Sequence, residues 1–222
     1  MYTRIKNLKI GNDGFLYYNN LKINHLKKKI DTFLLEKESL NDIDFVKQIL
    51  FLKETQDFKE EKIIEQIKDS KDKSEAEKTR LINIIRGYKY IESNQKITKN
   101  TLKTLYKILS ANLLDDYSKE NMGKYYRNRE VFILNSSFIE CDYDKGIPAD
   151  KVEEYMESCL NYINQKEELS PIDEFIKSQI IHFYLIYVHP YYDINGRTGR
   201  TLATWYLLNQ NANPYVIFNR AI

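Results

Sequence analysis

Cysteine, proline and glycine are all scarce in this sequence. Its 222 residues include two cysteines, four prolines and seven glycines. Cys141 and Cys159 could form at most one disulfide, so the sequence excludes a disulfide-rich scaffold and favours a reducing compartment. With 42% hydrophobic and 13% aromatic residues, the chain is neither collagen-like nor generally disordered. Its length suits one globular domain with an extension, or two small domains.

A strong net charge and a long apolar segment are also missing. Lysine plus arginine number 34 against 32 acidic residues, a net charge of +2, which does not suggest nucleic acid as a partner. The longest apolar run, 180–188, is interrupted by His182 and is about half of the ~20 residues that a membrane span needs. No apolar signal region follows the N-terminus. We therefore expect no nucleic acid or membrane partner and a cytoplasmic location, with a secreted effector left open.

The first third of the chain is predicted to be an extension. Two short apolar stretches flank a turn signal at 11–14, which predicts a hairpin over residues 5–18. A helical pattern follows from 24 to 71. Because the segment 69–78 contains only one apolar residue, Ala76, it is either a solvated link or a polar helix start. We place the boundary there: 1–75 is a hairpin and helical extension, and 76–222 is the main domain.

The main domain is predicted to be mostly helical. Apolar residues recur every three or four positions over 75–92, 99–114, 149–165 and 170–188. In the last helix, the predicted buried stripe consists of Ile176, Ile180, Phe183 and Tyr187. Between the second and third helices, 130–134 favours a strand and 142–148 a loop. We therefore predict an exposed hairpin, or flap, between Tyr125 and Cys141.

A short loop near the C-terminus carries the strongest chemical signal. The helix before it ends at His189, because a residue that precedes proline avoids helical geometry. The next helix begins near Asn195-Gly196, with Asn195 as its expected cap. Its N-terminus, together with Arg197 and Arg200 at i and i+3, suits a phosphate. Asp193 could bind Mg²⁺ and His189 could accept a proton, so the loop indicates phosphoryl or nucleotidyl transfer.

This loop resembles the signature of a known family. Residues 189–200 read His-Pro-Tyr-Tyr-Asp-Ile-Asn-Gly-Arg-Thr-Gly-Arg. They match seven positions of the Fic motif, His-Pro-Phe-x-Asp/Glu-Gly-Asn-Gly-Arg-x-x-Arg. The resemblance extends over about 78–219 and implies a helical Fic fold with a β-hairpin flap over the active site. It also implies transfer of AMP from Mg-ATP to a Tyr, Ser or Thr hydroxyl of a target protein, and the 18 tyrosines of the chain add auto-modification to this expectation.

The resemblance assigns a role to each matching residue. His189 is similar to the general base, Asp193 to the Mg²⁺ ligand, and Asn195 and Gly196 to the phosphate cradle. Arg197 and Arg200 resemble the phosphate-binding arginines. Upstream, Gly123 and Arg127 resemble a Gly-x-x-Arg motif with one extra residue between them. The following Val131, Phe132 and Ile133 are similar to the flap strand that pairs with an extended target segment.

Two residues depart from the family pattern. Tyr191 replaces phenylalanine, a mild change if its hydroxyl finds one partner. Ile194 replaces glycine, and a β-branched residue is poorly suited to a positive φ. Either the loop geometry differs here, or the nucleotide is held differently. Ile194 therefore keeps open a different donor nucleotide, or phosphate transfer.

Regulation and turnover also have alternatives. The family's inhibitory motif, Ser/Thr-x-x-x-Glu-Gly/Asn, has no full match: Thr32 and Glu36 have the spacing, but Lys37 ends it. By chain position the inhibitory glutamate would be near Glu54. Inhibition by a partner protein, by self-association or by a further C-terminal segment stays open. Two alternative functions also stay open: a Fic-fold binding module with little turnover, and an enzyme that removes AMP from modified proteins.

Overall fold

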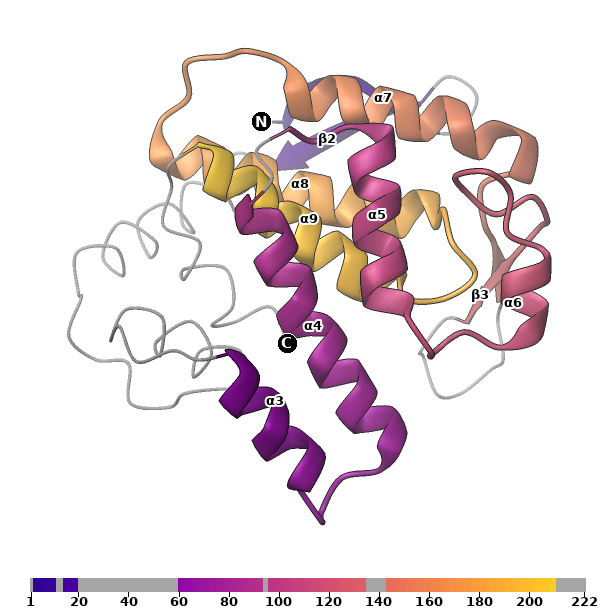
Figure 1. Cartoon of the computed structure of the whole chain (residues 1–222). Helices are drawn as coiled ribbons and strands as arrows, with labels where there is room; N and C mark the ends of the chain where they lie inside the picture. Colours follow the sequence, from indigo (N-terminus) through magenta and orange to yellow (C-terminus); the bar gives the residue numbers. More distant parts are fainter. Residues whose placement is uncertain (1, 11–13, 20–59, 94–95, 135–142, 211–222) are drawn as a thin grey trace.

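The computed structural model describes residues 2–10, 14–19, 60–93, 96–134 and 143–210, which are mainly helical (Figure 1). The helices are α3 (Glu60–Asp69), α4 (Glu75–Ser93), α5 (Lys99–Ser110), α6 (Asp116–Glu120), α7 (Val152–Asn164), α8 (Pro171–Val188) and α9 (Asn195–Asn209), with a 3-10 turn η1 (Ala149–Lys151) before α7. Two antiparallel pairs of strands accompany them: β1 (Tyr2–Ile10) with β2 (Gly14–Asn19), and β3 (Phe132–Leu134) with β4 (Tyr143–Lys145). Within these ranges no helix is long and apolar enough to cross a bilayer.

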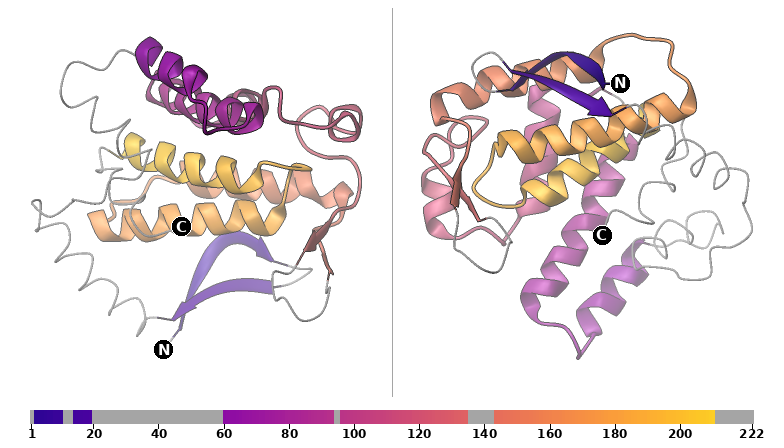
Figure 2. Two further views of the ribbon diagram at one scale, coloured as in Figure 1. Left: turned by 90° about the horizontal axis from the view of Figure 1, so that it is seen from below. Right: turned by 180° about the vertical axis from the view of Figure 1, so that it is seen from behind.

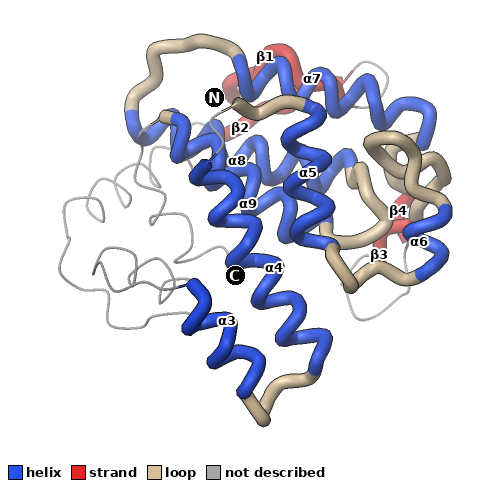
Figure 3. The backbone as a smooth tube through the Cα atoms, in the orientation of Figure 1, coloured by secondary structure: helices blue, strands red, loops and turns tan. Residues whose placement is uncertain are grey.

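The pair α8 and α9 lies at the centre of the molecule. Helices α4 and α5 pack against α9, and α7 packs against α8 (Figures 1 and 3). Figure 2 shows β1 and β2 on the opposite side of α8 and α9 from α3 and α4. Trp205 of α9 and Tyr184 of α8 are fully buried in the common core. The two central helices carry the predicted functional loop between them.

A glycine lets the two central helices approach each other. A Cβ atom at Gly199 would lie 2.9 Å from Cδ2 of His182, closer than carbon atoms pack without a shift. The position therefore favours the smallest residue. The close contact holds the start of α9 against the end of α8.

The start of α8 is formed as predicted, but its buried face is not the predicted one. Ser170 caps the helix by accepting a hydrogen bond from the N–H of Asp173, and Pro171 follows as the first helical residue. Phe183, which the sequence placed in the core, is 51% exposed. The buried residues of the second half of α8 are instead Ile181, Tyr184, Leu185 and Val188. The helix is apolar on several sides, so its periodicity did not select one face.

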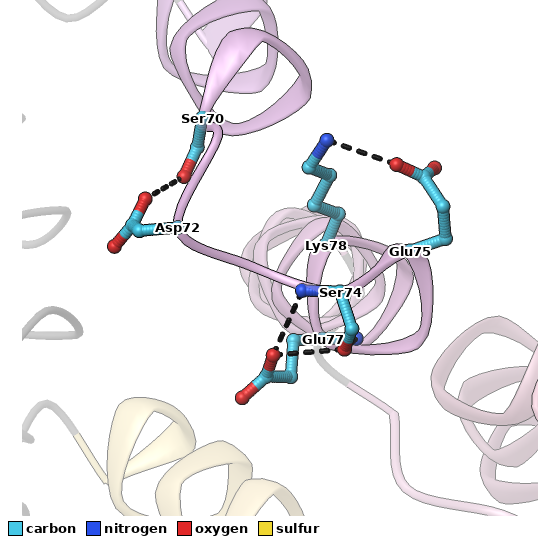
Figure 4. A network of polar contacts seen from close by, with 6 residues as sticks. All are labelled: Ser70, Asp72, Ser74, Glu75, Glu77 and Lys78. Carbon is cyan, nitrogen blue, oxygen red and sulfur yellow. Dashed lines mark hydrogen bonds and ion pairs between the residues drawn. The ribbon is translucent and has the colours of Figure 1, made fainter.

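The polar segment between α3 and α4 is both a turn and a helix start. Ser74 donates from its N–H and its hydroxyl to Glu77 Oε2, at 2.9 and 2.8 Å, and its Oγ accepts the N–H of Glu77 (Figure 4). This is a capping box. In the turn itself, the Ser70 hydroxyl donates to the Asp72 carboxylate. This hydrogen bond and the contact with the neighbouring Lys73 lower the pKa of Asp72 to about 2. The segment 69–78 was predicted to be either a solvated link or a polar helix start, and it contains both.

Other elements differ from the prediction in their extent. The hairpin predicted over 5–18 is present as β1 and β2. Helix α5 ends at Ser110 rather than 114, because Ala111 leaves helical geometry and Asn112 has a φ of 58°. Strand β4 occupies part of the segment 142–148 that was predicted to be a loop. The helical pattern before residue 60 lies outside the described residues.

The N-terminal hairpin shares the core of the helices. Strand β1 packs against α7, and Leu8 belongs to the same buried cluster as Trp205 and Leu105. The domain boundary near residue 75 stays a prediction.

Candidate active site

The loop between α8 and α9 is held by an unusual residue at each end. His189 ends α8 with a φ of 52° and a ψ of 58°, and its N–H donates to the carbonyl of Leu185 at 2.9 Å. Ile194 precedes α9 with a φ of 68° and a ψ of 10°. Both residues are in the left-handed region of backbone geometry, which residues other than glycine seldom adopt. The loop therefore turns sharply at both ends.

Ile194 has the geometry that glycine would adopt most easily. The sequence left open that Ile194 changes the geometry of the loop. Because Ile194 itself adopts a positive φ, no such change is needed to accommodate it. Its side chain is buried in the core cluster, which offsets the cost of the left-handed backbone. Ile194 also takes the position at which Asn195 was predicted to cap α9. That prediction is wrong: Asn195 is the first helical residue.

The side chain of Asn195 fastens the loop to the helix. Its Nδ2 donates to the carbonyl of Tyr191 at 2.8 Å, and its Oδ1 accepts the N–H of Tyr191 at 3.0 Å. The residue is buried. Both ends of the side-chain amide therefore fasten the loop, and the backbone N–H of Asn195 is left for a ligand.

His189 is suited to accept a proton. Burial lowers the pKa of its imidazole, and the positive charge of Arg127 lowers it further, against the opposite effects of the Ile186 carbonyl and the Asp193 carboxylate. Its Nδ1 is buried and makes no hydrogen bond to the part of the chain that is described. The lowered pKa favours the neutral ring, the form that a general base requires.

The first turn of α9 forms a positively charged corner. In the described residues, the N–H groups of Asn195, Gly196 and Arg197 have no recorded backbone acceptor, as expected at a helix start. A Cβ at Gly196 would lie 3.4 Å from Nη1 of Arg200, so this guanidinium lies beside the first turn. Nη1 of Arg197 is buried and unpartnered among the described residues. Helix dipole, free N–H groups and guanidinium groups together favour an anion.

A third arginine, Arg80 of α4, contributes to this corner. Burial lowers the pKa of Arg197, and Asp193 opposes that effect, while the like charges of Arg80 and Arg200 reinforce it. Arg80 therefore lies near enough to add to the positive field. No motif in the sequence points to Arg80, because it precedes the loop by more than a hundred residues and belongs to another helix.

Asp193 fits a site for a magnesium ion shared with a nucleotide. It is exposed, and its Oδ1 accepts the N–H of Ile194 at 2.5 Å. In the described ranges, no three His, Cys, Asp or Glu residues gather as a metal site. A cation at Asp193 would thus take its other ligands from phosphates and water, which is how Mg²⁺ is commonly bound.

Arg127 is a residue whose importance the sequence did not reveal. It is buried, and its guanidinium donates from Nε to the carbonyl of His189 at 2.7 Å, from Nη1 to Arg129 at 2.8 Å and from Nη2 to Ile147 at 2.5 Å. Its N–H also donates to the carbonyl of Pro190 at 2.9 Å. Arg127 therefore joins the base of the β3–β4 hairpin to His189. The sequence offered only the loose match to Gly-x-x-Arg.

The three predicted flap residues lie at the start of this hairpin. Val131 accepts a hydrogen bond from the N–H of Gly146 at 3.0 Å, and Phe132 and Ile133 lie on β3. Phe132 is 67% exposed. The structure thus brings the predicted loop residues together, and it connects them to the hairpin through Arg127.

Comparison with known proteins identifies the family. The model of the Fic/DOC family matches residues 96–207, half of the chain. The chain belongs to the Fic/DOC family. Family membership indicates a transferase domain of the Fic type. No curated protein matches the chain significantly.

Solved structures of Fic proteins have the same fold. A Fic family protein from Desulfovibrio desulfuricans matches with a TM-score of 0.61 and 20% identity, over 90% of this chain and 61% of its own. A Fic-domain signalling protein from Bacteroides thetaiotaomicron matches at 0.53 and 19%, over 64% of this chain and 52% of its own. Fic-1 from C. elegans matches with a TM-score of 0.54 and 17% identity, over 86% of this chain and 57% of its own. This chain therefore spans less than two thirds of each of these proteins.

Proposed function

We propose that the protein transfers AMP from Mg-ATP to a Tyr, Ser or Thr hydroxyl of a target protein. The observation that carries the proposal is the short loop that has His189, whose pKa is lowered, at one end and the free N-terminus of α9 at the other. A base beside an anion-binding corner is what transfer of a nucleotide to a hydroxyl needs. Family membership supports the same reaction class.

In the proposed reaction His189 removes the proton from the target hydroxyl. The hydroxyl oxygen forms a bond to the α-phosphorus, the bond to the β-phosphate oxygen breaks, and pyrophosphate leaves with the electron pair. The N–H groups at Asn195 and Gly196 and the guanidinium of Arg197 stabilise the charge that develops on the α-phosphate, and Arg200 holds the γ-phosphate. Mg²⁺ bound by Asp193 would neutralise the charge of the phosphates.

The β3–β4 hairpin is proposed as the place where the target docks. An extended segment of the target pairs with the strand around Val131, Phe132 and Ile133, and the exposed Phe132 supplies an apolar contact. Because Arg127 fixes the base of this hairpin to His189, the docked hydroxyl would be presented to the base in a constant register. We propose a protein as the partner, rather than nucleic acid or a membrane, with the enzyme acting in the cytoplasm or as a secreted effector. The 18 tyrosines of the chain make auto-modification part of the proposal.

Radiolabelled ATP tests the reaction directly. The purified protein is incubated with Mg²⁺ and ATP labelled on either the α- or the γ-phosphate, with His189→Ala as the control, and label on protein is measured. Label from the α-phosphate alone, lost in the control, is expected. Label from the γ-phosphate would replace AMP transfer by phosphate transfer.

Absence of label separates the remaining alternatives. If wild-type protein gives none, the experiment is repeated with Glu36→Gly and Glu54→Gly, and then with UTP, GTP and CDP-linked donors. Label that appears only in a glutamate variant would indicate autoinhibition of the proposed activity. Label from another nucleotide would overturn ATP as the donor, and none from any donor would favour a binding module.

A further inference from the structure

A cavity lies at the end of the two central helices that is opposite the candidate active site. Its volume is about 250 Å³, and it is lined by residues from the α7–α8 connection, the first turns of α8 and the end of α9. Since α8 and α9 are joined by the loop at His189, this cavity and the candidate active site lie at opposite ends of the pair (Figure 1). It takes no part in the proposed reaction. Its volume suits a molecule smaller than a typical drug.

The cavity contains a buried lysine with weak partners. Lys177 is only 3% exposed. Its Nζ lies 3.4 Å from the carbonyl of Gln165 and 3.5 Å from Glu167 Oε2, both longer than an ordinary hydrogen bond. The rings of Tyr162 and Tyr206, with centroids 5.0 and 5.4 Å away, add cation–π contacts. A buried ammonium group with three donors and two long contacts has capacity for a further anionic partner.

A buried carboxylate faces the same cavity. Glu174 is 8% exposed and accepts a hydrogen bond from the Tyr206 hydroxyl. It lies one turn before Lys177 on α8, yet among the described residues no ion pair joins the two. Because Tyr206 is the single side chain recorded on the Glu174 carboxylate in this part of the chain, the carboxylate can accept another donor.

The balance of charges selects the class of ligand. The lining contains two lysines, Lys166 and Lys177, and two glutamates, Glu167 and Glu174, so its formal charge is zero. A phosphate or other dianion would be repelled by the carboxylates, and a simple cation by the lysines. Ile97 and Ile163, both buried, contribute a small apolar part of a lining that is otherwise mostly polar. The cavity thus offers one buried charge of each sign beside a small apolar patch.

We infer that this cavity binds a free α-amino acid with an aliphatic side chain. The ligand carboxylate pairs with Lys177, its ammonium group pairs with Glu174, and its side chain lies on Ile97 and Ile163. A zwitterion adds an oppositely charged partner to each buried charge, beyond the Glu167 contact of Lys177 and the Tyr206 contact of Glu174, and leaves the net charge of the site unchanged. The binding site is independent of the reaction proposed above.

Calorimetry with three matched compounds tests the inference on the full chain. L-Leucine carries both charges, 4-methylpentanoate lacks the ammonium group, and 3-methylbutylamine lacks the carboxylate. We expect leucine to bind and each single-charge analogue to bind at least about tenfold more weakly. Equal binding of leucine and 4-methylpentanoate would make this an anion site and overturn the inference. No heat from any of the aliphatic amino acids up to about 10 mM would show a water-filled cavity and overturn it too.

Variants then locate the site. Lys177→Met and Glu174→Gln are each expected to weaken leucine binding about tenfold or more, whereas Lys166→Met at the exposed rim changes it less than about threefold. Circular dichroism establishes that each variant is folded. If Lys177→Met does not fold, Glu174→Gln decides alone, because it removes the carboxylate charge and keeps the shape of the side chain. Undiminished leucine binding by the folded variants would place the ligand elsewhere and overturn the inference.

Discussion

At the scale of single residues, Tyr191 carries a hydroxyl that the core does not use. The residue is fully buried, its ring stacks on Tyr106 at 3.7 Å, and its hydroxyl has no hydrogen-bond partner among the described residues. The family motif has phenylalanine at this position, which has no hydroxyl. We expected the hydroxyl of Tyr191 to find one hydrogen-bond partner, and among the described residues it has none. A buried unpaired hydroxyl costs stability, whereas the ring itself packs well.

Tyr191→Phe is therefore expected to raise the free energy of unfolding by about 1 kcal/mol. Urea denaturation measures the change. Tyr192→Phe is the matched control, because the Tyr192 hydroxyl accepts the N–H of Arg129 and lies 3.0 Å from the carbonyl of Asn121. That variant should lose about 0.5–1.5 kcal/mol. A loss of stability in Tyr191→Phe would contradict the account of this hydroxyl.

Ile194 presents two opposing effects whose magnitudes decide the outcome. Ile194→Gly removes left-handed strain worth about 1–2 kcal/mol, but it also deletes a buried side chain whose loss costs about 2–5 kcal/mol. We expect a net loss of about 1–3 kcal/mol in urea denaturation. Ile194→Val keeps the strain and loses one methylene, about 1 kcal/mol. A more stable glycine variant would show that strain outweighs packing here.

The lowered pKa of His189 predicts the pH dependence of the proposed transfer. A general base acts only when it is unprotonated, so the rate falls as the pH drops through the pKa of His189. Burial puts that pKa below its ordinary 6.5. The midpoint of the fall in the rate of label transfer should therefore lie below pH 6.5. A midpoint above 6.5 would contradict a buried, neutral His189.

At the scale of elements, Arg127 connects the β3–β4 hairpin to the catalytic loop. Arg127→Gln would leave the carbonyls of His189 and Ile147 without their donors in a buried place. We expect a loss of about 2–4 kcal/mol in stability, together with faster amide exchange over residues 188–195 and 146–148. Arg86 of α4 is exposed, and Arg86→Gln should change stability by less than about 0.5 kcal/mol. Unchanged exchange in the loop would contradict the connecting role.

Sequence reasoning succeeded for elements that carry their own local signals. The start of α8 was predicted because Ser170 and Pro171 are the residues that helix starts prefer. The loop from His189 to Asn195 was predicted because His189 precedes a proline. These signals depend only on neighbouring residues, so they can be read from the sequence.

Features that depend on distant partners could not be predicted. Strand β4 is three residues, Tyr143–Lys145, and it is defined only by its pairing with β3. The buried face of α8 follows from which helices surround it, since Phe183 and Tyr184 are both large aromatic residues that a core can accept. Arg80 and Arg127 act through elements far away in the chain. The side-chain role of Asn195 became visible only with the turn that places Tyr191 opposite it.

At the scale of the whole molecule, the core crosses the boundary that the sequence predicted near residue 75. Leu8 of β1 is buried with residues of α5, α7 and α9, and β1 packs against α7. A hairpin of two strands is not stable by itself, so it depends on this contact. The hairpin and the helices are thus expected to unfold together.

Leu8→Ala tests this cooperation between the hairpin and the helices. It should lower the stability of the whole protein by about 2–4 kcal/mol, because the cavity it leaves borders the common core. Thermal unfolding followed by far-UV circular dichroism, and by the fluorescence of Trp205 on α9, should show one transition that shifts down equally in both signals. Phe132→Ala, at an exposed position on β3, should change the free energy of unfolding by less than about 0.5 kcal/mol. If Leu8→Ala leaves the Trp205 transition in place, the extension folds separately from the Fic domain, and the boundary near residue 75 is a real division of the molecule.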